Sequence, residues 1–354
     1  MRVLIAGLAV AAGLAGSIAS TPVLGQAFVS DNVRTFAVLP DGVRFPEGIT
    51  ANPGNGDVYV GTFDFGPNAN ALLRYDSRGR LLARRGMGGT PLLGLEFGPK
   101  DGKLYIANFG ASRIQRVAAS LAGPIEDVAA IPGIGAPAPR SVDNPDGSSD
   151  TITFGSNGFP APNAMVFDAE GNLYVSDSFQ GAIFRIANAH SCSPCTASLV
   201  VHHPLLATAG FPPFGANGLA LSSDAAALFI ANTGDDRVLK LDLATFQVSV
   251  FAESVDGADG LAMDAHGLLW VAANQADRLV ALNDRGRVVA QVGSFNGIRE
   301  GRPEGFLFPA SLVIVGREAF VSNLALPLTA AIGDEPEEDV TRWTISRVQL
   351  NHLR

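Results

Sequence analysis

Four oxygen-bearing side chains occupy the same position in similar short stretches of the chain. Each stands directly before a glycine or alanine that opens an apolar segment, and they are Glu47, Asn163, Asn217 and Asp259. Two carboxylates and two amide carbonyls are hard oxygen donors, and Ca²⁺ takes about 6 to 8 such oxygens in flexible geometry. The two carboxylates would repel each other without a cation if the fold brought them together. The residue types therefore predict a divalent metal site, provided that these positions meet.

The four stretches belong to a repeat that occurs six times. Each copy has a head residue, a small residue, an apolar strand, a tight turn and a second apolar strand that ends at a polar corner. The six head positions are Glu47, Leu93, Asn163, Asn217, Asp259 and Ala310. A period of about 40 to 50 residues with four short strands per unit is typical of a propeller. We therefore predict an all-β fold, a six-bladed β-propeller, in which the heads face one axial cavity.

The heads resemble those of the SMP-30/gluconolactonase/LRE-like family, six-bladed propellers related to paraoxonases and strictosidine synthase-like proteins. The motifs that carry the resemblance are Glu47-Gly48, Pro162-Asn163, Asn217-Gly218-Leu219 and Asp259-Gly260-Leu261. The resemblance covers nearly all of the chain after residue 27, and it implies that the four oxygen-bearing heads bind a catalytic divalent metal. Two heads depart from the family pattern, because Ala164 stands where many members have Asp and Ile49 where many have Pro. The resemblance therefore does not specify a sugar lactone as the substrate.

The residues and the resemblance together predict a metal-dependent hydrolase of a lactone or a similar cyclic ester. One divalent metal ion would polarise the ester carbonyl, with Ca²⁺ as the expected ion and Zn²⁺ or Mn²⁺ as alternatives. Asp259, directly or through a water that the metal holds, is the predicted general base. Asn108 and Asp177, at two strand corners, are predicted to orient the metal ligands or to meet the substrate. Hydrogen bonding to their own loops is the alternative role for these two residues.

A non-catalytic binding propeller is the alternative function. The stretch Tyr105-Ile106-Ala107-Asn108, followed by residues 113–117, also resembles NHL repeats, which commonly bind proteins or other ligands. The polar heads would then hold a structural ion or water. Oxygen-bearing residues at four heads and apolar residues at two favour the enzyme, because a repeat kept only for folding would not vary in this way. The fold alone does not decide, since propellers host many functions.

Composition restricts the partners. The 354 residues include 25 Lys and Arg against 34 Asp and Glu, and the formal net charge of −9 argues against a nucleic-acid partner. The 40 glycines and the low charged fraction of 17% suit short strands joined by tight turns. We expect a monomer that binds a small-molecule substrate.

The first 27 residues predict export. Arg2 precedes an apolar or small-residue stretch from Val3 to Ile18, and Gly25-Gln26-Ala27 is a small-x-small cleavage site. This stretch is shorter than the roughly 20 residues that a spanning helix needs, which favours cleavage over an uncleaved anchor. We predict a signal peptide at residues 1–27, a single propeller domain at 28–354, and a secreted or periplasmic protein that does not bind the membrane after cleavage.

Three long insertions and one unpaired strand surround the repeats. A strand from Val33 to Leu39 has no local partner and blade six lacks an outer strand, so the N-terminal strand is expected to close the ring. Residues 132–160 are either a lid over the cavity or a loose surface insertion. Residues 295–309 and 324–340 are further candidate walls. The acidic run at residues 334–339 is interpreted as a solvated loop tip rather than a second cation site.

Cys192 and Cys195 form a Cys-Ser-Pro-Cys motif in the predicted turn between the outer strands of blade three. A single pair cannot complete a zinc site from cysteines alone. A redox motif is the alternative, but no helix opens behind the pair to lower a thiol pKa. We therefore predict a small disulfide that pins the turn.

Overall fold

The structure is a computed structural model, and it describes residues 28–30, 32–67, 69–155, 159–329 and 335–350. The predicted signal peptide at residues 1–27 lies outside the described residues. Within the described ranges, no helix has the length and apolar character needed to cross a membrane. The division into a signal peptide and one domain stays a prediction.

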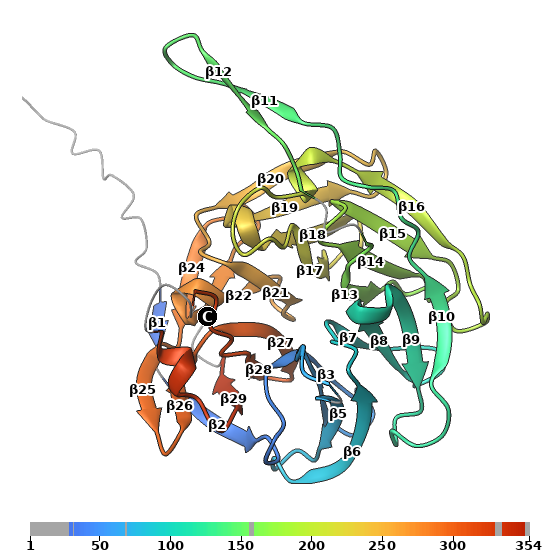
Figure 1. Ribbon diagram of the computed structural model, residues 1–354, viewed down its shortest axis with the longest axis vertical. Coiled ribbons are helices and arrows are strands. Elements are labelled where there is room, and N and C mark those ends of the chain that lie inside the picture. Colours follow the sequence, from blue (N-terminus) through green and yellow to red (C-terminus); the bar gives the residue numbers. More distant parts are fainter. Residues whose placement is uncertain (1–27, 31, 68, 156–158, 330–334, 351–354) are drawn as a thin grey trace, which may run out of the picture.

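Six four-stranded antiparallel units surround a central axis like the blades of a fan (Figure 1). Blade one contains β3 (Pro46–Ala51), β4 (Val58–Thr62), β5 (Asn70–Tyr75) and β6 (Leu81–Gly88). Blade two contains β7 (Leu95–Phe97), β8 (Leu104–Asn108), β9 (Arg113–Val117) and β10 (Glu126–Ala130). Blade three contains β13 (Pro162–Phe167), β14 (Leu173–Asp177), β15 (Ala182–Ile186) and β16 (Ala197–His202).

The remaining three blades follow the same order from the axis outward. Blade four contains β17 (Ala216–Leu221), β18 (Ala227–Asn232), β19 (Arg237–Asp242) and β20 (Val248–Glu253). Blade five contains β21 (Ala258–Met263), β22 (Leu269–Ala273), β23 (Arg278–Leu282) and β24 (Val288–Val292). Blade six contains β27 (Pro309–Val315), β28 (Glu318–Asn323), β29 (Thr344–Gln349) and β2 (Val33–Val38). The predicted six-bladed propeller is confirmed.

The N-terminal part of the chain belongs to two blades. β2 is the strand expected at Val33 to Leu39, and it pairs antiparallel with β29 as the outer strand of blade six. β1 (Phe28–Ser30) pairs in parallel with β24 and adds a fifth strand to blade five. Blade six is therefore built from both ends of the described chain.

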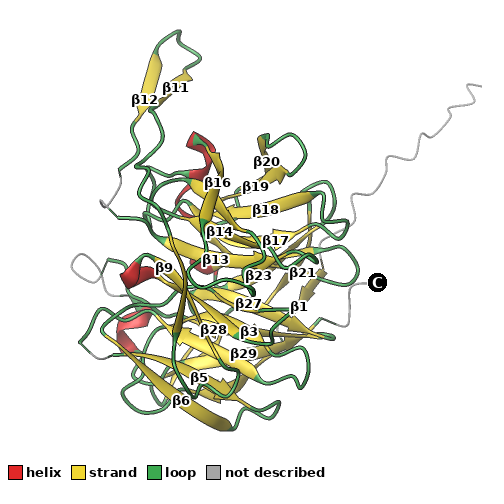
Figure 2. Cartoon of the chain, turned by 90° about the vertical axis from the view of Figure 1, so that its right-hand side faces the viewer, coloured by secondary structure: helices red, strands yellow, loops and turns green. Residues whose placement is uncertain are grey.

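Two hairpins and five short 3-10 helices lie outside the blades in the described part of the chain. The hairpins are β11 (Arg140–Asp143) with β12 (Ser149–Ile152), and β25 (Phe295–Arg299) with β26 (Arg302–Gly305). The 3-10 helices are η1 (Phe109–Ala111), η2 (Pro204–Leu206), η3 (Thr233–Asp235), η4 (Asn274–Ala276) and η5 (Pro336–Asp339). The β11–β12 hairpin projects beyond the edge of the disc, away from the axis (Figures 1 and 2). It does not cover the axis, so the lid interpretation of the 132–160 insertion does not apply to this hairpin.

Burial is greatest in the second strands of the blades and least in the outer strands. The second strands β4, β8, β18 and β22 are buried along their whole length, since neighbouring blades cover both of their faces. The outer strand β6 alternates between exposed and partly exposed residues. Aromatic pairs join blades: the Tyr59 and Phe97 ring centroids are 4.9 Å apart, and the same distance separates the centroids of Tyr105 and Phe167. Edge-to-face contacts of this kind stabilise a packed core beyond the area that they bury.

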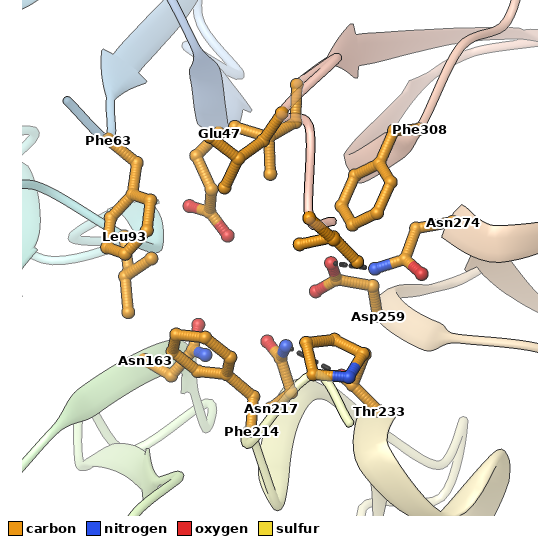
Figure 3. A pocket seen from close by; sticks show the side chains of 14 residues that line it. Glu47, Phe63, Leu93, Asn163, Phe214, Asn217, Thr233, Asp259, Asn274 and Phe308 are labelled. Carbon is orange, nitrogen blue, oxygen red and sulfur yellow. Dashed lines mark hydrogen bonds between the residues drawn. The ribbon is translucent and has the colours of Figure 1, made fainter. Parts of the chain in front are cut away.

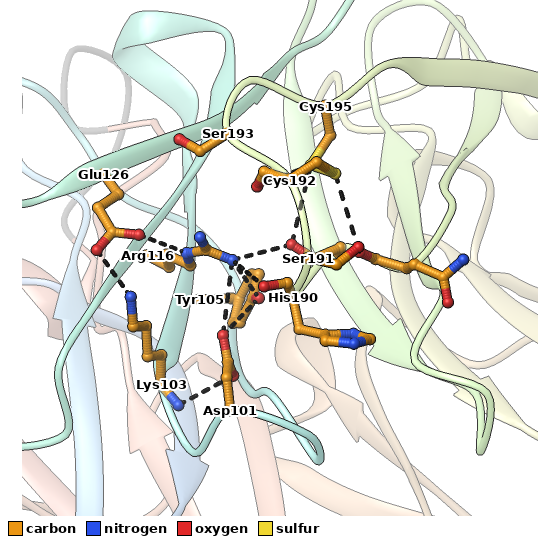
Figure 4. A network of polar contacts seen from close by, with 12 residues as sticks. Asp101, Lys103, Tyr105, Arg116, Glu126, His190, Ser191, Cys192, Ser193 and Cys195 are labelled. Atoms are coloured by element: carbon orange, nitrogen blue, oxygen red, sulfur yellow. Dashed lines mark hydrogen bonds and ion pairs between the residues drawn. A yellow bond between two sulfur atoms is a disulfide. The ribbon is translucent and has the colours of Figure 1, made fainter.

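Arg116 on β9 ties blade two to blade three (Figure 4). Its Nε donates to Glu126 at 2.7 Å, and its Nη1 donates to the carbonyl oxygens of Ala189 and His190 at 3.0 and 3.1 Å. Those carbonyls lie in the turn between β15 and β16, which also holds the disulfide between Cys192 and Cys195. Because the Arg116 side chain is only 8% exposed, its removal would leave buried carbonyl groups without a donor.

We expect Arg116→Ala to lower the free energy of unfolding by about 3 kcal/mol, because the carbonyls of Ala189 and His190 lose their donor. Arg113→Ala is the matched control on the same strand, since Arg113 is 40% exposed and pairs with the exposed Asp127. That change is expected to cost less than about 1 kcal/mol. Chemical denaturation of both variants measures the difference, and equal losses would contradict a special role for Arg116.

Candidate functional site

A bulge in the innermost strand places each oxygen-bearing head residue at the axis. Register shifts separate the strand partners on either side of Glu47, Asn163, Asn217 and Asp259. A bulge bends its strand and re-aims a side chain that the regular pleat would send elsewhere. The four side chains consequently converge from blades one, three, four and five (Figure 3). The structure thus brings the predicted ligand set together.

The small residue after the head sets how closely the blades approach. A Cβ on Gly48 would lie 2.1 Å from the carbonyl oxygen of Leu93, and one on Gly218 would lie 2.1 Å from the carbonyl oxygen of Asp259. A Cβ on Gly94 would lie 2.5 Å from the carbonyl oxygen of Asn163. Real Cβ atoms do not come this close to backbone atoms, so the glycines are a steric requirement of the narrow axis. This explains why the head-plus-glycine motif recurs in the sequence.

The four heads form the floor of a cavity of about 40 Å³. Thr233 and Asn274 complete the polar floor. The walls are apolar and come from the buried Phe63, Leu93, Pro212, Phe308 and Leu324, together with the partly exposed Phe214, Leu326 and Leu328. Apolar walls with few polar groups are typical of small-molecule sites.

Hydroxyl groups fix the orientation of the two amide heads. Ser178 donates its hydroxyl proton to the carbonyl of Ala216 and accepts from Asn163 Nδ2 at 2.9 Å. Thr233 likewise donates to the carbonyl of Ala258 and accepts from Asn217 Nδ2 at 2.8 Å. With each Nδ2 held in this way, the carbonyl oxygen of each amide lies on the opposite side, and that of Asn217 points toward the cavity (Figure 3). The two amide heads therefore offer their oxygens rather than their N–H groups to the cavity.

The two carboxylates of the floor are buried and incompletely paired. Asp259 Oδ2 accepts from Asn274 Nδ2 at 2.9 Å, whereas Asp259 Oδ1 and Glu47 Oε2 have no hydrogen-bond partner among the described residues. Burial raises the pKa of Asp259 to about 8, against the hydrogen bond from Asn274 that lowers it. Burial, and then the nearby charge of Asp259, raise the pKa of Glu47 well above its usual range. Unpaired buried carboxylate oxygens of this kind fit a cation, which would offset both the burial and the repulsion.

The donor set is mixed. Among the described residues, no group of three or more His, Cys, Asp or Glu side chains is placed to hold a metal. A cation at the floor would therefore depend on the amide oxygens of Asn163 and Asn217 as well as on the two carboxylates. Oxygen donors of this type suit Ca²⁺ better than metals that prefer sulfur or imidazole.

Asn108 and Asp177 are not among the residues that line the cavity. Asn108 Oδ1 accepts from the backbone of Ala111, and Asp177 accepts from the backbone of Ala161, Phe179 and Gln180. Both side chains thus hold their own corners, which was the alternative role. The expected role of orienting the metal ligands belongs instead to the residue that follows the corner. Ser178 and Thr233 are such residues, and they accept from the amides of Asn163 and Asn217. The one-residue difference follows from strand geometry, because successive side chains point to opposite sides.

Sequence reasoning missed one part of the cavity wall and anticipated another. The missed residues, Pro212 and Phe214, lie in the connection between β16 and β17, whereas Leu326 and Leu328 follow β28. The second of these segments is within the candidate wall at residues 324–340, and Phe308 is within that at 295–309. In the acidic run, the described residues 335–339 are exposed or partly exposed and Asp334 lies outside the described residues. The apolar Phe-Pro-Pro-Phe sequence at residues 211–214 was a signal for the first segment.

We expect Gly218→Ala to lower the free energy of unfolding by about 1 to 3 kcal/mol, because the new methyl group must push two inner strands apart. Gly86→Ala on the outer strand β6 is the control, since no atom lies within 4 Å of its added Cβ. We expect the control to change stability by less than about 0.5 kcal/mol. Denaturant titration of both proteins tests this, and a Gly218→Ala protein as stable as the control would show that the axis is not tightly packed.

Comparisons with known proteins agree with the fold. The model of the family described as SMP-30/gluconolactonase/LRE-like region matches residues 208–294, which include two of the four oxygen-bearing heads, Asn217 and Asp259. Lactonase drp35 of Staphylococcus saprophyticus is 24% identical over 158 residues, which are 40% of this chain and 43% of the relative. The match therefore spans less than half the length of that relative.

Solved structures with the same propeller cover most of the chain. Regucalcin, a calcium-binding protein from Agrobacterium tumefaciens, has a TM-score of 0.59 and 15% identity over 91% of this chain and 95% of its own. A gluconolactonase from Xanthomonas campestris has a TM-score of 0.55 and 13% identity over 90% of this chain and 89% of its own. At these identities the likeness concerns the fold. The protein is a six-bladed propeller that carries an SMP-30/gluconolactonase/LRE-like region.

Proposed function

We propose that this protein is an exported, metal-dependent hydrolase that opens a lactone or a similar cyclic ester. The observation that carries the proposal is the pair of buried carboxylates, Glu47 and Asp259, whose unpaired oxygens lie among amide oxygens at the floor of one cavity. The relatives support it, because drp35 is named a lactonase and the Xanthomonas propeller is described as a gluconolactonase.

One divalent cation, with Ca²⁺ as the expected ion, would be held by Glu47, Asn163, Asn217 and Asp259. The regucalcin likeness supports Ca²⁺, since that protein is described as calcium-binding. When bound, the cation supplies an electrophile that polarises the ester carbonyl and stabilises negative charge on its oxygen. Its positive charge would also allow both buried carboxylates to stay ionised.

Asp259 is the residue that we propose as the general base. Asn274 holds its Oδ2, which leaves Oδ1 with no hydrogen-bond partner in the described part of the chain. The carboxylate would take a proton from the attacking water while the water oxygen bonds to the ester carbonyl carbon. The ring C–O bond then breaks, the proton passes to the departing alkoxide oxygen, and the product is the open-chain hydroxy acid. The apolar walls would limit competing water at the reacting bond.

A binding propeller without catalysis remains the alternative from another functional class. It shares the fold and would use the floor for a structural ion. The two proposals predict different measurements. Only the hydrolase opens a lactone, and its turnover should be lost on replacement of Asp259 even when excess cation has restored metal binding.

We expect Glu47→Gln to weaken Ca²⁺ binding by at least about tenfold, because the number of charged ligands sets Ca²⁺ affinity. Asp259→Asn is expected to weaken binding similarly and to lower kcat on a lactone panel by about 100-fold or more, even at saturating Ca²⁺, since it also removes the base. Calorimetry and pH-stat assays with Ca²⁺, Mn²⁺ and Zn²⁺ measure the two effects.

Glu253→Gln, an exposed residue at the end of β20, is the control for both measurements and should change neither. Wild-type turnover in the Asp259→Asn protein at saturating metal would remove the general base from the mechanism. Tight Ca²⁺ binding with no turnover of any lactone by the unmodified protein would favour the binding propeller.

The export proposal concerns residues 1–27. We expect the mature protein to begin at Phe28 and to accumulate in the periplasm or the medium, whereas a chain that lacks residues 1–27 stays in the cytoplasm. Mass spectrometry of the purified protein and cell fractionation of both chains give the result. An intact Met1 on protein recovered from the membrane fraction would instead indicate an uncleaved anchor.

A further inference from the structure

The cavity above the floor has a uniform chemical character. Within the described residues, its only charged lining groups are Glu47 and Asp259, and its walls consist of carbon-rich side chains. Phe63, Leu93, Phe308 and Leu324 are at most 6% exposed and lie next to the polar floor. Hydrogen-bond donors and acceptors are thus confined to the floor, where the ester group of a substrate would be held.

The aromatic part of the wall is supported from behind. The ring centroids of Phe63 and Phe109 are 5.4 Å apart, those of Phe109 and Phe179 are 5.6 Å apart, and those of Phe179 and Phe214 are 5.5 Å apart. This chain of rings fixes Phe63 and Phe214, the two members that line the cavity. A wall held in place before binding loses little side-chain freedom when an apolar group contacts it.

Apolar surface also continues out of the cavity. The Phe65 ring is 4.9 Å from that of Phe63, and Phe65 is 68% exposed. Phe214, Leu326 and Leu328 are partly exposed where the cavity opens to solvent. An apolar chain longer than the buried part of the cavity would therefore still remain in contact with apolar side chains.

These walls discriminate between two kinds of lactone. The hydroxyl groups of a sugar lactone would lose water against Phe63, Phe214 and Leu326 without gaining hydrogen bonds, which is unfavourable for each group. An alkyl or aryl substituent at the same place would bury apolar surface, which is favourable in proportion to its area. The cavity therefore favours a substrate with one polar end.

We propose that the substrate is a lactone with an alkyl or aryl substituent, bound with its ester at the polar floor and its substituent against Phe63, Phe214, Leu326 and Leu328, and that polyhydroxylated sugar lactones are poor substrates. This inference rests on the proposed ester hydrolysis at the same floor. Phe214 and Leu328 are the specificity-determining residues, because they are the partly exposed wall residues from two different connections.

Two series of compounds test the proposal in the Ca²⁺-loaded protein. The first consists of γ-lactones from γ-butyrolactone to γ-decalactone with glucono-δ-lactone beside them, and kcat/KM is measured. The second consists of the matching γ-alkyl lactams, in which N–H replaces the ring oxygen, and their affinities are measured by calorimetry. We expect kcat/KM and affinity each to rise by about two- to fourfold per methylene group in the longer members. Glucono-δ-lactone should have a lower kcat/KM than γ-octalactone.

Variants show whether the wall causes the dependence on chain length. Phe214→Ser and Leu328→Ser should each reduce the increase per methylene in both series, and Phe214→Leu should restore most of it. Phe246→Ser is the matched control, since Phe246 is 52% exposed and lies between β19 and β20, outside the cavity. It should leave the dependence on chain length unchanged.

The two series separate the failure of this inference from that of the proposed function. Turnover of lactones with no dependence on chain length, or with glucono-δ-lactone preferred, would overturn the inference and leave ester hydrolysis standing. Lactam affinity that rises with chain length in a protein that opens no lactone would support the apolar cavity and overturn the hydrolase. Absence of lactone turnover, together with lactam affinity that does not rise with chain length, would overturn both.

Discussion

Steric crowding at the axis is the constraint on which the site depends. At four of the six inner strands the residue after the head has room for little more than a hydrogen atom, as Gly48 and Gly218 show. Hydrogen bonds between blades use the head carbonyls: Gly94 N donates to Asn163 O at 2.8 Å, and Ser322 donates to the Glu47 carbonyl. The backbone of each head is thus immobilised by the neighbouring blade, and only its side chain remains to face the cavity.

The six head positions carry chemically different side chains, four with oxygen atoms and two apolar. Leu93, Phe308 and Leu324 contribute apolar surface to the cavity from blades two and six. Asp259 has Asn274 as a hydrogen-bond donor. The two carboxylates therefore differ although both are buried: burial raises the pKa of Asp259 against the hydrogen bond from Asn274, while burial and the charge of Asp259 both raise that of Glu47. The same position of the repeat thus holds Asp259, which accepts a hydrogen bond from Asn274, and Glu47, whose Oε2 has no partner among the described residues.

Much of this arrangement was predictable from the sequence, because a propeller sends equivalent positions of its repeat to equivalent places. The heads could be aligned, so their convergence followed from the fold. The residues that hydrogen-bond to the head side chains were harder to predict. Ser178, Thr233 and Asn274 lie one residue beyond the strand corner, and the alignment of repeats of variable length is not accurate to one residue. Phe63 and Leu324 occupy the same position in blades one and six, and they line the cavity.

The walls were less predictable for a different reason. Phe214 belongs to a connection that no alignment of the repeats points to, whereas Leu328 lies in the insertion at residues 324–340 that its length marked as a candidate wall. Asn108 and Asp177 illustrate the opposite case, because polar corner residues are attracted to nearby backbone N–H groups before any ligand is considered. Repeated features could thus be inferred from their copies, whereas unique loops required coordinates.

Blade six has a consequence for biogenesis. Its outer strand β2 and its neighbour β29 lie at opposite ends of the described chain, so their ladder is the most sequence-distant pairing in the fold. Contacts between such remote segments form late, because the intervening polypeptide must first be ordered. During synthesis, β2 emerges early and waits without its partner until the last blade has left the ribosome. Until then the propeller is incomplete and has an unpaired strand edge at each end. The ring of blades can close only after β29 has been translated.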